Sequence, residues 1–176
     1  MRQAKLFSAV LSVAAFAAVG LWLSRLNCLA GQTGSPDSMK SAPGWKLQDL
    51  SGKTVRSADF KGKVVILDFW ATWCPPCRAE IPGFIKLQKK YQAQGLAIVG
   101  VSVDQASTDS IRSFVQKQGL NYPVVQSDEK IETAYGGIEG LPTTFIIDWA
   151  GHIMKRHLGF TDQAEFEKEI KPLLSP

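Results

Sequence analysis

The stretch that decides the fold reads VVILDFWATWCPPCRAEIP and covers residues 64–82. Its first seven residues form a continuous run of β-branched and aromatic side chains, which is typical of a strand covered on both faces. Two cysteines separated by two prolines follow, and residues 76–94 have a helical pattern that ends at Gly95. The sequence therefore predicts a buried strand that leads through a Cys-Pro-Pro-Cys turn into a helix.

On either side of this stretch, strand and helix signals alternate. Residues 45–50 and 54–57 flank Ser51-Gly52-Lys53, and this pattern predicts an N-terminal β-hairpin. The later segments predict a strand over 96–103, a helix over 108–118, a short strand over 124–125, a short helix over 129–135, a hairpin over 143–148 and 152–158, and a helix over 162–174. This order predicts an α/β fold with a mixed central sheet flanked by helices.

The composition favours one compact domain and argues against nucleic acid as a partner. The chain has 176 residues, 45% hydrophobic and 20% charged, and its 3 Cys are too few for a disulfide-stapled scaffold. The net charge of +4 depends on the first thirty residues, which contain Arg2, Lys5 and Arg25 and no acid. The remaining chain contains 17 basic and 16 acidic residues, and no run of Lys and Arg exceeds two, so no stripe for phosphate contacts is expected.

The N-terminal segment is expected to direct the chain out of the cytoplasm. Residues 6–23 contain no charge, follow a basic start, and as a helix would span roughly 27 Å. We expect residues 1–30 to be a signal anchor or, alternatively, a cleaved signal peptide. The rest is then exported, either held at the periplasmic face of the cytoplasmic membrane or released as a soluble protein. Turn-forming residues over 31–43 predict a flexible linker, which leaves 44–176 as the folded domain.

The Cys-Pro-Pro-Cys turn predicts a redox-active disulfide between Cys74 and Cys77. Free N–H groups and aligned peptide dipoles at a helix N-terminus stabilise a thiolate placed there. We expect Cys74 to be the exposed, attacking sulfur and Cys77 to be the resolving one. Exchange would pass through a mixed disulfide between Cys74 and a substrate cysteine, which Cys77 then displaces.

The two prolines favour a reducing pair over an oxidising one. Pro75 and Pro76 have no N–H, so the amides of Cys77 and Arg78 are the donors left for the Cys74 sulfur. No His lies between the cysteines to add a positive charge. A weakly stabilised thiolate leaves the reduced form weakly stabilised, and this predicts a reductase.

The sequence supports other uses of the two cysteines less well. A zinc site needs about four ligands, and the chain has no second Cys pair, so no metal is expected. A thiol peroxidase is an alternative, although Ala71 stands three residues before Cys74, where that chemistry uses Thr. A copper carrier or holdase using both sulfurs is another. The chain has no cofactor motif, so we expect no cofactor. An exported reductase acts in an oxidising compartment and needs a source of electrons, so we expect a transmembrane thiol electron donor as partner.

Two segments resemble the thioredoxin superfamily: residues 68–82, and Gly140-Leu141-Pro142-Thr143-Thr144-Phe145. The sequence looks most similar to the membrane-anchored TlpA/ResA/CcmG-like thiol-disulfide oxidoreductases, with an AhpC/TSA-redoxin-like domain over about 42–174. The resemblance implies a thioredoxin-like fold with the N-terminal hairpin and a central αβ insertion over 104–125. It also implies reduction of protein disulfides in cytochrome c maturation or copper-site assembly, with apocytochrome c or copper-site proteins as substrates.

The resemblance also implies a substrate-binding surface. Pro142 matches the proline that the family keeps in cis beside the disulfide. The Leu141 backbone would then be free to pair with an extended substrate segment. Trp73 is expected to form an exposed platform for the substrate beside Pro75 and Pro76, whereas Trp70 is expected to pack beneath the cysteines.

Two carboxylates are the remaining candidate catalytic residues. Asp68 lies six residues before Cys74, where thioredoxin has a buried acid, and an inward position would raise its pKa and let it take the proton from Cys77. Glu80 matches a glutamate that lies near the active cysteines in the ResA-like group, where it would tune their acidity or contact substrate. The alternatives are an ordinary hydrogen-bonded strand residue for Asp68 and a solvated carboxylate in the first helical turns for Glu80.

Overall fold

The computed structural model describes residues 40–174. The predicted anchor or signal segment and residues 31–39 of the predicted linker lie outside this range, and the boundary at residue 44 stays a prediction. At the start of the described chain, the Ala42 N–H donates to the Gly151 carbonyl at 2.8 Å, and Ser41 forms an isolated β-bridge with His152. Among residues 40–174, no helix has the length and apolar character needed to cross a membrane.

The centre of the fold is a five-stranded mixed sheet with the strand order β5-β4-β3-β6-β7. Three parallel strands, β3, β4 and β5, are followed by β6 and β7, which run antiparallel to their neighbours. The strands are β3 (Val64–Trp70), β4 (Leu96–Ser102), β5 (Val124–Gln126), β6 (Thr143–Ile147) and β7 (Ile153–Leu158). Every residue of β3 is buried, as its continuous apolar run predicted. The predicted mixed α/β sheet is confirmed.

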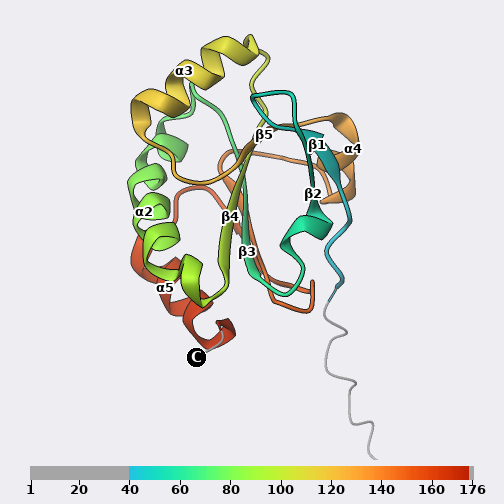
Figure 1. The fold of residues 1–176 in the computed structure, drawn as a ribbon, viewed down its shortest axis with the longest axis vertical. Helices are drawn as coiled ribbons and strands as arrows, with labels where there is room; N and C mark the ends of the chain where they lie inside the picture. The colour runs from blue at the N-terminus through green and yellow to red at the C-terminus, as the bar shows by residue number, and fades with distance from the viewer. Residues whose placement is uncertain (1–39, 175–176) are drawn as a thin grey trace, which may run out of the picture. The chain divides into compact units, whose positions relative to one another are not determined.

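Helices cover both faces of the sheet (Figure 1). The helices α2 (Pro75–Tyr91), α3 (Thr108–Gln118) and α5 (Gln163–Ile170) lie on one side, and α4 (Glu129–Ala134) lies on the other. The predicted hairpin is present as β1 (Lys46–Gln48) and β2 (Thr54–Arg56), and the bridge Asp49–Val125 joins it to β5. The short 3-10 turns are η2 (Ser57–Phe60), η3 (Gln92–Gln94) and η4 (Lys171–Leu173). The predicted αβ insertion corresponds to α3 and β5.

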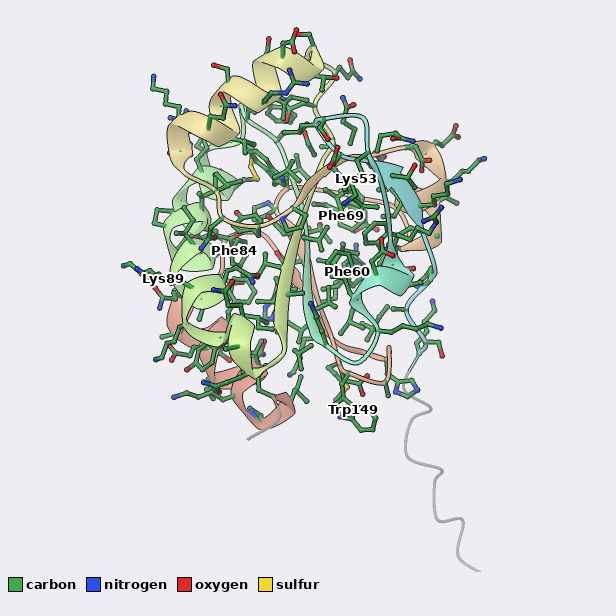
Figure 2. The ribbon with its side chains drawn as sticks, viewed as in Figure 1. Lys53, Phe60, Phe69, Phe84, Lys89 and Trp149 are labelled. Carbon is green, nitrogen blue, oxygen red and sulfur yellow. A yellow bond between two sulfur atoms is a disulfide. The ribbon has the colours of Figure 1, made fainter. Side chains whose placement is uncertain are left out.

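Alternation along β3 divides the core into two apolar layers. Ile66 and Trp70 belong to the layer that contains Phe84 of α2, whereas Leu67 and Phe69 belong to the layer beneath α4 and the hairpin (Figure 2). Because side chains of a strand point alternately to opposite faces, Asp68 points to the same side as Ile66 and Trp70. The fold thus places a carboxyl under the helix that begins at the cysteines.

The last helix differs from its prediction. We expected a helix over 162–174, but α5 ends at Ile170 and the chain continues as η4. Pro172 has no N–H to donate to the carbonyl four residues earlier, so the regular helix cannot continue through it. The N-terminus of α5 is as expected, because the Asp162 carboxylate accepts a hydrogen bond from the Glu165 N–H at 2.9 Å.

Candidate active site

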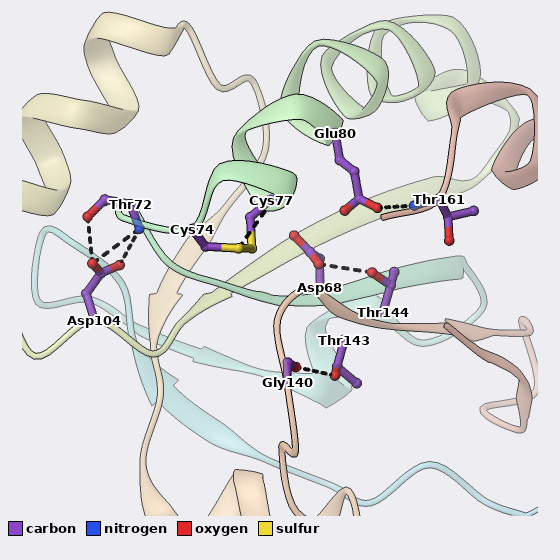
Figure 3. The surroundings of a disulfide bond; sticks show 10 residues. All are labelled: Asp68, Thr72, Cys74, Cys77, Glu80, Asp104, Gly140, Thr143, Thr144 and Thr161. Atoms are coloured by element: carbon purple, nitrogen blue, oxygen red, sulfur yellow. Dashed lines mark hydrogen bonds between the residues drawn. A yellow bond between two sulfur atoms is a disulfide. The ribbon is translucent and has the colours of Figure 1, made fainter. Parts of the chain in front are cut away.

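The disulfide lies where β3 passes into α2. Cys74 has an extended backbone and forms the N-cap of α2, and its sulfur is bonded to that of Cys77 with an S–S distance of 2.08 Å and a Cα–Cα distance of 5.4 Å (Figure 3). The Cys77 N–H donates to the Cys74 Sγ at 3.3 Å. The sequence predicted that this amide, at the start of the helix, would stabilise a thiolate on Cys74.

Two details of this geometry correct the prediction. The Arg78 N–H does not serve the sulfur, since it donates to the Cys74 carbonyl at 3.1 Å. Nor does exposure distinguish the two cysteines, because the exposed fractions of Cys74 and Cys77 are 3% and 2%. The first difference arises because α2 begins at Pro75, so residue 78 makes the first i to i−4 bond of the helix. Within the described residues, the Cys74 sulfur accepts one hydrogen bond.

Asp68 is buried beneath the disulfide, as predicted. Asp68 is only 4% exposed, and its Oδ1 accepts a hydrogen bond from Thr144 Oγ1 at 3.0 Å. Thr144 is the residue directly opposite Asp68 in the β3–β6 register. Burial raises the pKa of Asp68 to about 7, and the bond from Thr144 opposes part of that rise. Asp68 is therefore both hydrogen-bonded and poised to change protonation near neutral pH.

Glu80 is buried as well, so its interpretation as a solvated carboxylate is wrong. It is 4% exposed, because the N-terminal turns of α2 place it over the sheet and against the segment that precedes α5. The Thr161 N–H donates to Glu80 Oε1 at 2.7 Å, while Oε2 has no hydrogen-bond partner among residues 40–174. Burial and the negative charge of Asp68 raise the pKa of Glu80 to about 8.

The two carboxyl groups form one acidic pair on the Cys77 side of the disulfide. Figure 3 shows the side chains of Asp68 and Glu80 pointing toward one another from β3 and α2. Two ionised carboxylates in a buried space repel each other, so a proton on either group stabilises the arrangement. The pair can accept or release a proton near neutral pH, next to a sulfur that must lose one.

The predicted substrate surface forms an apolar pocket beside the disulfide. The pocket has a volume of about 440 Å³, and the residues Trp73, Cys74, Pro75, Pro76 and Leu141 contribute to its lining. Trp73 is 66% exposed and Trp70 is buried, as expected for a platform and a packing residue. The Leu141–Pro142 peptide bond is cis, which confirms the prediction for Pro142. Pro142 itself is buried behind the lining.

The sequence reading missed two exposed apolar residues next to this surface. Leu158 and Phe160 are both exposed, and the Gly159 N–H between them donates to the Pro142 carbonyl at 2.8 Å. They therefore extend the apolar surface beyond the cis proline. The predicted hairpin between β6 and β7 is present, but its register, with Leu158 opposite Thr143, decides where these two residues lie.

A disulfide at a helix start, a cis-proline loop beside it and a sheet of this order define a thiol-disulfide oxidoreductase with a thioredoxin-like fold. The family model described as "AhpC/TSA family" matches residues 39–156. The chain belongs to this family and is a TlpA/ResA/CcmG-like member of the thioredoxin superfamily.

Individual relatives agree with this assignment. The chain is 39% identical over 133 residues to the thioredoxin-like protein YneN of Bacillus subtilis, a match that covers 74% of this chain and 77% of that protein. It is 34% identical over 176 residues to the thiol-disulfide oxidoreductase ResA of Halalkalibacterium halodurans, covering 98% and 99% of the two proteins. Among solved structures, a thiol:disulfide interchange protein from Chlorobium tepidum has a TM-score of 0.73 and 33% identity, covering 79% of this chain and 99% of that one.

Proposed function

We propose that this oxidoreductase is an exported reductase of protein disulfides. The observation that carries the direction of electron flow is the environment of Cys74, whose sulfur accepts one amide hydrogen bond within the described residues. The ionisable groups beneath the pair are the carboxyls of Asp68 and Glu80, whose ionisation opposes a nearby thiolate. A poorly stabilised thiolate makes the reduced pair a good electron donor.

The proposed reaction begins with the reduced pair. The Cys74 thiolate attacks one sulfur of a substrate disulfide, a bond forms between Cys74 and that sulfur, and the other substrate sulfur leaves with the electron pair. Cys77 then gives its proton to the Asp68–Glu80 pair and attacks the Cys74 sulfur. The Cys74–Cys77 disulfide forms, the second substrate sulfur leaves as a thiolate, and the substrate has gained two electrons.

The surface around the disulfide favours extended polypeptide segments as substrates. A substrate strand would pair with the Leu141 backbone beside the cis bond, and apolar side chains near its cysteine would occupy the pocket next to Trp73. By the resemblance to ResA-like proteins, the candidate substrates are apocytochrome c and copper-site proteins. A transmembrane thiol protein would return electrons to the pair.

Export is supported by the N-terminal sequence and by one similar structure. Residues 6–23 contain no charge and follow Arg2 and Lys5, as in a signal anchor or signal peptide. A secreted thiol-disulfide isomerase from Corynebacterium glutamicum has a TM-score of 0.71 and 26% identity, covering 81% of this chain and 96% of that one. We propose attachment to the periplasmic face of the membrane through residues 1–30.

A redox titration of the full chain tests the proposed direction. Cys28, the third cysteine of the chain, would be replaced by Ser, and the variant would be equilibrated with mixtures of reduced and oxidised dithiothreitol, so that Cys74 and Cys77 are the only protein thiols that titrate. We expect a midpoint close to that of thioredoxin, about −270 mV, because the thiolate is weakly stabilised. A midpoint near that of DsbA, about −120 mV, would reject the reductase in favour of an oxidase or isomerase.

A further inference from the structure

Asp104 holds the loop that leads into Cys74. Its carboxylate accepts the Thr72 N–H at 3.0 Å through Oδ2 and the Thr72 hydroxyl at 2.6 Å through Oδ1 (Figure 3). Ser102 Oγ, at the end of β4, donates to Oδ2 at 2.7 Å. Hydrogen bonds to an ionised acceptor are roughly twice as strong as those between neutral groups. One side chain, two residues after the end of β4, thus binds both polar groups of Thr72.

The loop held in this way has few other constraints. Residues 71–73 lie between the end of β3 and the N-cap of α2, and they carry the exposed Trp73. The backbone bonds around them are Val103 N–H to the Trp70 carbonyl at 2.9 Å and Cys74 N–H to the Ala71 carbonyl at 3.2 Å. Thr72 is therefore the residue through which the middle of the loop is hydrogen-bonded to Asp104, just after β4.

The hydrogen bonds between Asp104 and Thr72 matter most when no bond joins the two cysteine sulfurs. In the disulfide form, the covalent bond keeps the Cys74 and Cys77 Cα atoms 5.4 Å apart. In the mixed disulfide, Cys74 is bonded to the substrate and only the surrounding structure keeps it near Cys77. We propose that Asp104 is a positioning residue for disulfide exchange, which keeps Cys74 within reach of the Cys77 thiolate while their sulfurs are unbonded.

This inference deepens the proposed function and concerns its second step. Cys77 attacks the Cys74 sulfur, the bond between Cys74 and the substrate sulfur breaks, and that sulfur leaves with the electron pair. The rate depends on the effective concentration of one sulfur at the other, which falls when the loop is free to move. Loss of the Asp104 contacts therefore slows resolution and also weakens the internal disulfide relative to the dithiol.

Variants of Asp104 and Thr72 separate positioning from the effect of charge. Asp104→Ala removes the contacts and a negative charge, whereas Thr72→Val keeps the charge and removes the hydroxyl bond. Thr72→Ser keeps both donors. As a matched control, Asp148→Ala removes a carboxylate that accepts the His152 N–H at 2.8 Å in the turn after β6, at the opposite end of β3 from Cys74.

The experiment uses the full chain in the Cys28→Ser background with insulin as the disulfide probe. The mixed disulfide is trapped by acid and its decay is followed by mass spectrometry, and the midpoint is titrated against dithiothreitol. We expect about tenfold slower decay in Asp104→Ala and a smaller slowing in Thr72→Val, which keeps the amide hydrogen bond to Asp104. A matching tenfold change in the equilibrium constant would raise the midpoint by about 30 mV. Thr72→Ser should restore wild-type values, and Asp148→Ala should change neither value while lowering thermal stability.

Three results would overturn the inference: wild-type decay in Asp104→Ala, an effect in Asp104→Ala that Thr72→Val does not share, or an equal effect in Asp148→Ala. Its failure is distinct from failure of the proposed function. A wild-type midpoint near that of DsbA would reject the reductase whether or not the Asp104 variants decay slowly, and a low midpoint with unchanged decay would reject only the role of Asp104.

Discussion

Among single residues, the Asp68–Glu80 pair is our proposed acceptor for the proton of the buried Cys77 thiol. Cys77 has almost no contact with water, and Asp68 and Glu80 are the buried acids beside it. Their pKa values of about 7 and about 8 are close to the pH at which the protein would act. Burial, together with the charges of both acids, raises the pKa of Tyr122 well above its ordinary value, so Tyr122 stays neutral.

The replacement Asp68→Asn is expected to slow disulfide reduction at least tenfold at neutral pH, because the group that takes the Cys77 proton is lost. The Asn oxygen can still accept the hydrogen bond from Thr144. The measurement is the rate of insulin reduction between pH 5.5 and 9, in which the wild-type rate should rise through pH 7 to 8 and the variant should lose most of that rise. The matched variant Glu80→Gln should show a smaller loss, since Asp68 remains.

Asp68→Asn, which should lower the rate of insulin reduction, should raise the stability of the folded protein at alkaline pH. The pKa of Asp68 is higher in the folded protein than in the unfolded chain, so the folded state holds the proton more tightly. The stability that this contributes is present below about pH 4 and is lost as the pH rises through about 7. Asp68→Asn should therefore raise the melting temperature at pH 8.5 relative to wild type. Lower stability at that pH together with lower activity would indicate a purely structural role.

Among the elements, the close approach of β3 and β4 leaves a space that Trp70 fills. Gly100 of β4 lies opposite Asp68, and a Cβ at this position would be only 2.8 Å from Trp70 Nε1. Trp70 is buried at the end of β3 and packs in the same layer as both cysteines. The absence of a side chain at residue 100 thus makes room for the Trp70 indole, which packs in the core layer that contains both cysteines.

The replacement Gly100→Ala is expected to destabilise the protein by about 2 kcal/mol, because it forces the Trp70 ring to move in a filled layer. For a domain of this size, the melting temperature should fall by about 5 °C. The matched control is Gly44→Ala, where the nearest atom to the added Cβ would be Ser57 Oγ at 3.7 Å, an ordinary contact. Equal melting temperatures for the two variants would show that the indole is not held as described.

The limits of the helices could be predicted from the sequence where a proline or a glycine marks the start or the end of the helix. The helix predicted over 76–94 is present as α2 from Pro75 to Tyr91, followed by the 3-10 turn η3 before Gly95, and α3 ends at Gln118, just before Gly119, as predicted. The prediction for the Arg78 amide was wrong because it depended on which residue begins the helix. A shift of one residue decides whether that N–H bonds the sulfur or the Cys74 carbonyl.

At the scale of the whole molecule, the partners of the site come from distant parts of the chain. Thr144 lies 76 residues from Asp68, Thr161 lies 81 residues from Glu80, and Asp104 lies 32 residues from Thr72. The cysteines, both acids and the cis proline could be predicted because they lie in two short motifs. Their hydrogen-bond partners could not, because only strand pairing and helix packing bring those residues close.

The path of the chain also separates the site from the point where the described chain begins. Residues 40–42 run beside the turn after β6, next to Gly151 and His152. Because β6 is antiparallel to β3, this turn lies at the opposite end of β3 from Cys74. The described chain therefore begins at the end of the sheet opposite the disulfide.

In the proposed reaction, Cys74 attacks the substrate and Cys77 resolves the mixed disulfide. The most direct measurement uses two variants in the Cys28→Ser background, Cys77→Ser and Cys74→Ser. Each is reduced and mixed separately with insulin, and the covalent adducts are mapped by mass spectrometry. We predict that Cys77→Ser accumulates a stable adduct through Cys74, and that Cys74→Ser forms none and has lost insulin reduction. Insulin reduction by Cys74→Ser at the wild-type rate, or an adduct that forms only through Cys77, would contradict the account.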